Sequence, residues 1–179
     1  TGAIFKDSTY FTEAVFSSKA DFSNASFSGN TANFTRAVFN GAAGFKKASF
    51  PPNTHFKETV FSDEVSFFVT KFKGDATFIR AKCSKEAYFD RATFSGNTLF
   101  TGSVFCDVAY FQKSTFSGIV KFEGVMFSKL ANFKEATFTE ESLFPLVTWQ
   151  GSLDLSNSTF QKKAVFKESS FENSVNFSG

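Results

Sequence analysis

Phenylalanine recurs along the whole chain at spacings that alternate between five and six residues. The positions in this series are called repeat centres, and there are 32 of them between Phe5 and Phe177, with one longer gap of seven residues between Phe27 and Phe34. Twenty-nine of the centres are Phe, the other three are Cys83, Trp149 and Leu155, and Phe68 is the only Phe outside the series. An unbroken period of this kind indicates a repeat architecture.

A second, small residue lies two positions before almost every centre. It is nearly always Ala, Ser, Thr or Val, with Leu153 as the large exception. Residues two apart in an extended segment point to the same face, so the small and the large side chain both point inward. An α-helix does not fit, because a spacing of five turns successive Phe side chains by roughly 140° and no single apolar seam forms.

Glycine marks the corners between these extended segments. Nine of the 11 glycines lie two residues after a centre, where the other units carry mainly Asn, Asp, Glu, Lys or Arg. Glycine adopts positive φ without steric cost, so we expect left-handed or tight-turn conformations at this position. Pro51 and Pro52 are expected to shape one corner.

Residues 20–24 (ADFSN) and 32–36 (ANFTR) match the unit of the pentapeptide-repeat family: a small residue, a polar residue, a central Phe or Leu and two turn residues. The chain resembles the Phe-rich branch in which every second unit has an extra residue. This resemblance implies an all-β fold, a right-handed quadrilateral parallel β-helix with one unit per side. About eight coils of ~22 residues would form a rod roughly 40 Å long at ordinary strand spacing.

We therefore predict one solenoid domain over residues 1–179. Its inward column on one side is expected to consist of Phe5, Phe27, Phe50, Phe72, Phe94, Phe116, Phe138 and Phe160. Unpaired backbone groups at the open ends of a solenoid invite association. They favour an end-to-end homodimer or flanking domains of a longer chain.

Outward residues also form sensible columns when the sequence is arranged with four repeat units in each coil. One side reads Thr93, Thr115, Thr137 and Thr159, and the opposite side reads Val15, Val38, Val60, Lys82, Val104 and Met126. A corner column reads Asp63, Lys85, Asp107 and Lys129, so unlike charges face each other in adjacent coils. Such pairs are weak individually, but they help to fix the register.

Composition excludes more functions than it suggests. Nineteen Lys and Arg stand against 17 Asp and Glu, a balance that predicts neither a nucleic-acid nor a membrane partner. There is no apolar run of membrane-spanning length and no signal-peptide pattern, which slightly favours the cytoplasm. We expect no cofactor, no small-molecule substrate and no catalysis, because a Phe-filled core leaves no cavity and His55 is the only histidine. Cys83 should be buried and inert, Cys106 should lie near a corner, and the two should not bond.

The candidate interaction surface contains residues that interrupt the polar exterior. An apolar break is expected at Phe68 and Val69, with Ile79 one unit further on, and Tyr88 should stack on Tyr110. Arg91 and Lys113 are expected at the neighbouring corner. These residues are typical of a protein-binding patch. A solvated aromatic column without a binding role is the alternative, and we interpret residues 143–149 as an adapted coil.

Three functions stay open. The first is a rigid, non-enzymatic scaffold that binds protein. The family resemblance implies a second, a DNA mimic that binds a topoisomerase, although the slightly basic charge argues against it. The third is ice binding through the Thr column, which covers only half of the rod.

Overall fold

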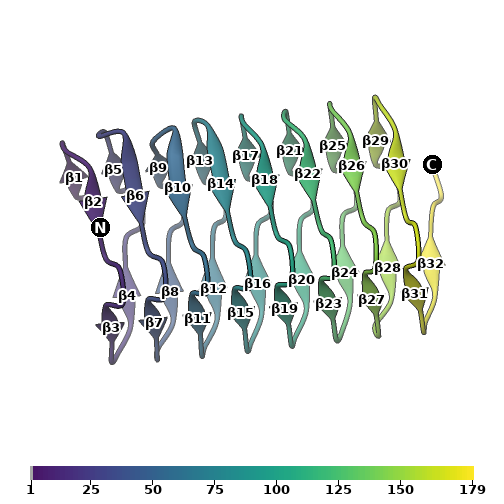
Figure 1. Ribbon diagram of the computed structural model, residues 1–179, viewed down its shortest axis with the longest axis horizontal. Helices are drawn as coiled ribbons and strands as arrows, with labels where there is room; N and C mark the ends of the chain where they lie inside the picture. The colour runs from purple at the N-terminus through teal and green to yellow at the C-terminus, as the bar shows by residue number, and fades with distance from the viewer. Residues whose placement is uncertain (1) are drawn as a thin grey trace.

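The protein is a four-sided rod of stacked coils, as a computed structural model that describes residues 2–179 shows (Figure 1). Thirty-two short strands form four parallel sheets of eight strands each, and every sheet takes every fourth strand of the chain. The two termini lie at opposite ends of the rod. The predicted all-β solenoid of about eight coils is therefore confirmed.

The four sheets are called the first to fourth side, in the order in which the chain enters them. The first side consists of β1 (Ile4–Phe5), β5 (Ser26–Phe27), β9 (Ser49–Phe50), β13 (Lys71–Phe72), β17 (Thr93–Phe94), β21 (Thr115–Phe116), β25 (Thr137–Phe138) and β29 (Thr159–Phe160). The second side consists of β2 (Thr9–Tyr10), β6 (Thr31–Asn33), β10 (Asn53–His55), β14 (Asp75–Thr77), β18 (Thr98–Leu99), β22 (Val120–Lys121), β26 (Ser142–Leu143) and β30 (Ala164–Val165).

The other two sides complete each coil. The third side consists of β3 (Val15–Phe16), β7 (Val38–Phe39), β11 (Val60–Phe61), β15 (Lys82–Cys83), β19 (Val104–Phe105), β23 (Met126–Phe127), β27 (Thr148–Trp149) and β31 (Ser170–Phe171). The fourth side consists of β4 (Ala20–Asp21), β8 (Ala43–Gly44), β12 (Val65–Ser66), β16 (Ala87–Tyr88), β20 (Ala109–Tyr110), β24 (Ala131–Asn132), β28 (Leu153–Asp154) and β32 (Val175–Asn176).

The register places equivalent residues of successive coils directly above one another. Phe72 pairs with Phe50 below and with Phe94 above, its equivalents in the two adjacent coils. The one seven-residue gap adds its extra residue at the corner after Phe27, and the strands on both sides of that corner keep their pairing. The predicted Thr and Val columns are likewise in register.

The core is a set of stacked phenylalanine columns. Phe94 stacks on Phe72 with ring centroids 4.7 Å apart and planes 4° apart. Rings of different sides meet edge to face, as Phe78 and Phe89 do at 5.5 Å and 87°. Both geometries suit the quadrupole of an aromatic ring. In the predicted first-side column, Phe5 and Phe160 are half-buried and the other six rings are buried.

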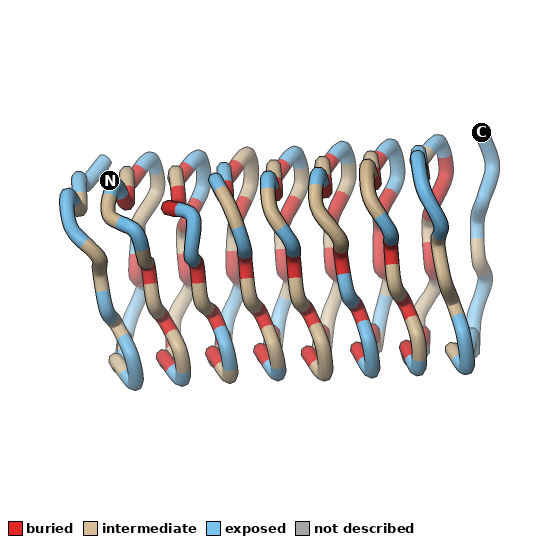
Figure 2. The backbone as a smooth tube through the Cα atoms, turned by 45° about the horizontal axis from the view of Figure 1, so that its top comes forward, coloured by how far each residue is buried: buried red, intermediate tan, exposed pale blue. Residues whose placement is uncertain are grey.

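Burial falls off at the two ends of the rod. Along the middle coils buried residues alternate with intermediate and exposed ones, whereas the first and last coils contain few buried residues (Figure 2). Phe177 is 63% exposed, for example. A ring in a terminal coil has a neighbouring coil on one face only, so the columns protect the central coils best.

The substituted centres are accommodated by their neighbours. Trp149 continues the third-side column and stacks on Phe127 at 4.7 Å and 5°. Leu155 is smaller than the Phe it replaces, and the inward residue before it, Leu153, is correspondingly larger. Both leucines are buried, with 1% of Leu153 and 3% of Leu155 exposed.

The corners are of two kinds, and this corrects the expectation for glycine. Every five-residue unit ends in a turn whose third residue has positive φ, and this residue is usually not glycine: Arg91 has φ 54°. In that turn the amide N–H of Ala92 donates to the carbonyl of Phe89 at 3.0 Å, the pattern of a type II turn.

Most corner glycines are needed for a different reason. Among the nine, only Gly102, Gly124 and Gly179 have positive φ. The others lie in the longer units, where the backbone of the previous coil is very near. A Cβ on Gly96, for example, would lie 2.6 Å from the carbonyl carbon of Gly74. Close approach between coils, and not turn conformation, requires glycine there.

This difference predicts different changes in stability at two glycines. Gly96→Ala should lower the free energy of unfolding by about 1–3 kcal/mol, because the new Cβ would push adjacent coils apart. Gly124→Asn should leave stability almost unchanged, since its φ of 63° suits Asn and nothing lies within 4 Å of the added Cβ. Urea unfolding followed by Trp149 fluorescence measures both, and equal losses would contradict the assignment of two corner types.

One buried hydroxyl predicts a stabilising substitution. Thr98 Oγ1 has no hydrogen-bond partner among the described residues, although the side chain is 1% exposed. Thr98→Val should therefore raise the free energy of unfolding by about 1 kcal/mol, because it removes an unpaired buried hydroxyl. Valine fits this column, since the adjacent inward residue is Val120.

Thr59→Val is the matched control. The Thr59 hydroxyl donates to the carbonyl of Phe34 at 2.8 Å, so its loss should lower the free energy of unfolding by about 1 kcal/mol. Urea unfolding of the two variants should give changes of opposite sign. A loss of stability in Thr98→Val would contradict the prediction.

Candidate functional site

The outward column of the fourth side contains two adjacent tyrosines. From the first coil to the last it reads Asp21, Gly44, Ser66, Tyr88, Tyr110, Asn132, Asp154 and Asn176. The rings of Tyr88 and Tyr110 stack with centroids 5.0 Å apart and planes 3° apart. The parallel register creates this pair, because equivalent residues of successive coils lie directly above each other.

The corner between the fourth and first sides lies directly beside the tyrosines. Phe68 and Val69 follow the fourth-side strand β12, and Arg91 and Lys113 occupy the corner in the next two coils. Phe68, Arg91 and Lys113 line a hollow of about 230 Å³ together with Asp90 and Gln112. Six of the seven predicted surface residues thus share one edge of the rod, which we call the aromatic edge: Phe68, Val69, Tyr88, Arg91, Tyr110 and Lys113.

Ile79 does not belong to the aromatic edge. It follows β14 on the second side and precedes β15 on the third, whereas Phe68 lies between the fourth and first sides. These corners are diagonally opposite in the coil. The expected single apolar break through Phe68, Val69 and Ile79 is therefore wrong, because the two repeat units that separate them in the chain make up half a coil.

A second hollow, of about 310 Å³, opens between Phe68 and Tyr88. Its other lining residues are Lys46, Glu64 and Ser66, which sequence reasoning missed. A smaller hollow of about 160 Å³ continues it past Gly44 toward Asp21. The sequence does contain a sign of this hollow. At equivalent positions of successive coils, the small residues Gly44 and Ser66 come directly before the much larger Tyr88.

The charges around these hollows are mixed in sign. Burial raises the pKa of Tyr88, and the carboxylates of Glu86, Glu64 and Asp90 raise it further. Burial also raises the pKa of Asp90. At the corner, Lys113 pairs with Glu135 at 3.3 Å, while Arg91 forms no ion pair within residues 2–179. The aromatic edge therefore offers a partner carboxylates as well as the guanidinium of Arg91, which is not in an ion pair.

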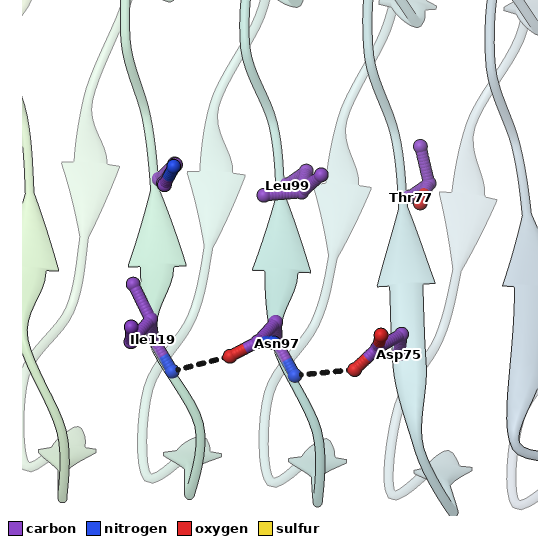
Figure 3. A pocket seen from close by; sticks show the side chains of 6 residues that line it. Asp75, Thr77, Asn97, Leu99 and Ile119 are labelled. Atoms are coloured by element: carbon purple, nitrogen blue, oxygen red, sulfur yellow. Dashed lines mark hydrogen bonds between the residues drawn. The ribbon is translucent and has the colours of Figure 1, made fainter.

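A separate hollow of about 280 Å³ lies on the second side, and it too was missed. Asp75 accepts a hydrogen bond from the N–H of Asn97 at 2.8 Å, and the side-chain oxygen of Asn97 accepts one from the N–H of Ile119 at 3.1 Å (Figure 3). Leu99 lies beside this ladder. The carboxylate and amide are used to join three successive coils, so we assign this ladder to stacking.

The other candidate chemistry is dispersed. His55 is half-buried on the second side, and no three His, Cys, Asp or Glu side chains of the described chain gather as a metal site requires. The predicted column of alternating charges lies at the corner between the third and fourth sides. One of its ion pairs is present, between Lys129 and Asp107 at 2.9 Å. No helix in the described part is long and apolar enough to cross a membrane.

The two thiols occupy the expected environments and are both free. Cys83 replaces a core Phe and is buried, and Cys106 is half-buried just after Phe105. Burial raises the pKa of the Cys83 thiol far above its usual range. The thiolate is the reactive form, so Cys83 should be inert in the folded protein.

The prediction is that one thiol reacts with a disulfide reagent in the native protein and two react in denaturant. Cys106→Ser should abolish the native reaction, whereas Cys83→Ser should keep it. A count of zero thiols in denaturant without reductant would contradict the assignment, as it would mean that the two cysteines are bonded.

Comparison with known proteins agrees with this geometry. No curated protein matches the chain. The family model for pentapeptide repeats (9 copies) matches residues 1–49 and 78–126, which together are more than half of the sequence. The matched stretches contain 17 of the 32 repeat centres. The chain therefore belongs to the pentapeptide-repeat family.

Proposed function

We propose that this rod is a non-enzymatic scaffold that binds a protein partner through its aromatic edge. The observation that carries the proposal is the combination of the stacked pair Tyr88 and Tyr110 with Phe68, the one Phe outside the core series. A pentapeptide-repeat solenoid suits a structural or interaction role. Aromatic residues beside hollows are the usual energetic centres of protein interfaces.

Rigidity supports a binding role for this edge. The backbone on both sides of Tyr88 is bonded to neighbouring coils; Phe89 N–H, for example, donates to the carbonyl of Tyr110 at 2.7 Å. A tyrosine side chain has few rotatable bonds, and here its ring is held by a second ring. Binding to such a surface costs little conformational entropy.

The remaining alternatives gain less support. The Thr column on the first side is in register, but it contributes a single Thr per coil to that side: Thr93, Thr115, Thr137 and Thr159. Ion pairs between coils, such as Lys129 with Asp107, give the surface both signs of charge, which does not resemble a polyanion. Ice binding and topoisomerase binding stay hypotheses, and so do the end-to-end dimer and flanking domains.

A quantitative affinity experiment tests the proposal. The protein is immobilised as wild type and as the double variant Tyr88→Ser, Tyr110→Ser, and proteins of its source cells are enriched on both. A partner of the aromatic edge should lose at least tenfold in enrichment on the double variant, since two hot-spot side chains are removed. The partner is then purified and its dissociation constant measured by calorimetry.

The matched control removes two outward apolar side chains from another face. Leu99→Ser, Leu143→Ser lies on the second side and should bind the partner as the wild type does. Circular dichroism melts verify that all three proteins are folded. Equal binding of the tyrosine variant and the wild type, or no purified protein that binds, would contradict the proposal.

A further inference from the structure

The hollow between Phe68 and Tyr88 combines aromatic walls with acidic surroundings. It measures about 310 Å³, and Glu64, Ser66 and Lys46 complete its lining. It exists because Ser66, in the coil before Tyr88, is too short to continue the tyrosine column. A partner side chain of the length of Tyr88 would extend the column in the place that Ser66 leaves open.

Phe68 presents an aromatic face to this hollow that already attracts a cation. The ammonium Nζ of Lys46 lies 5.4 Å from the centre of the Phe68 ring. The face of an aromatic ring is electronegative, and a cation within about 6 Å of its centre is attracted. Lys46 forms no ion pair within residues 2–179, so no carboxylate holds its ammonium in place over the ring.

The carboxylates near Tyr88 are also unpaired. Glu64, Glu86 and Asp90 all act on its phenol and raise its pKa, and none of them takes part in an ion pair in the described chain. An unpaired carboxylate next to an aromatic ring is a favourable environment for a positive group that carries an apolar stem. Lys46 is the cation in the lining of the hollow, and it is paired with none of these carboxylates.

We propose that the hollow between Phe68 and Tyr88 receives a lysine or arginine side chain of a protein partner, with Lys46 moving aside. This inference rests on the proposed function of the aromatic edge and names the chemistry of its partner. The methylene stem of the incoming side chain packs between the rings, and its charge faces Glu64. An apolar side chain fits less well, because it would bury the Glu64 carboxylate without a partner.

The test uses two peptides that differ only in charge. The probes are acetyl-Gly-Ser-Arg-Ser-Gly-amide and the same peptide with the uncharged isostere citrulline in place of Arg. Binding is followed by proton–carbon NMR of the full chain with labelled tyrosine rings. The chain has three tyrosines, and Tyr10, which is 65% exposed on the second side, is the internal control.

The expected result is a saturable shift of the Tyr88 signals with the arginine peptide, with little shift at Tyr10 and none with citrulline. Phe68→Ser and Glu64→Gln should each weaken binding by roughly two- to fivefold, the range of exposed cation–π and ion pairs. Lys46→Ser should strengthen it by a similar factor, because the competing cation is removed.

Two control variants separate the hollow from general electrostatics. Lys82→Ser removes one positive charge from the third side, and Glu123→Gln removes one negative charge from the corner after the second side. Neither should change the affinity. Equal binding of the citrulline peptide, equal shifts at Tyr10, or a Lys46→Ser variant that binds no better than Lys82→Ser would overturn the inference.

Failure here is distinguishable from failure of the proposed function. If a purified partner requires Tyr88 and Tyr110 but tolerates replacement of each of its basic interface residues by Gln, the edge binds protein and the cation site is wrong. If the arginine peptide binds as expected but no protein partner depends on the tyrosines, the hollow does bind a cationic side chain. In that case the proposal that this side chain belongs to a protein partner is overturned.

Discussion

Everything in this molecule depends on the contact between one coil and the next. A single coil buries little, because its rings expose both faces and its backbone groups lack partners. When coils stack in register, each Phe gains parallel neighbours above and below, and each strand gains hydrogen bonds on both edges. The half-buried rings at the two ends show the same dependence, since each is covered on one face only. Stability is thus a property of the stack.

Stacking in register also creates the surface. Because every outward residue lies above its equivalent in the preceding coil, Tyr88 and Tyr110 form a pair without any special local structure. A short residue in the same column, such as Ser66, leaves a hollow beside a tall one. The candidate site is therefore made by a change in side-chain size along a column, while the backbone of the rod stays regular.

The sequence predicted the fold well because spacing alone distinguishes inward from outward positions and sets the length of a coil. It predicted less about the corners, since the same glycine position serves two different needs: positive φ at Gly124 and close approach between coils at Gly96. Ile79 was predicted to lie beside Phe68 because the two residues are near each other in the chain, although half a coil separates them in space. Hollows were missed because they depend on the relative heights of residues from different coils.

The extra residue after Phe27 has a wider consequence. It is absorbed entirely at one corner, and the strands before and after it keep their partners. A corner of this rod can therefore change in length without disturbing the columns, which makes the corners natural points for inserting longer loops. In such a protein, new binding elements can be added along an edge one coil at a time, while the aromatic core continues to hold their spacing.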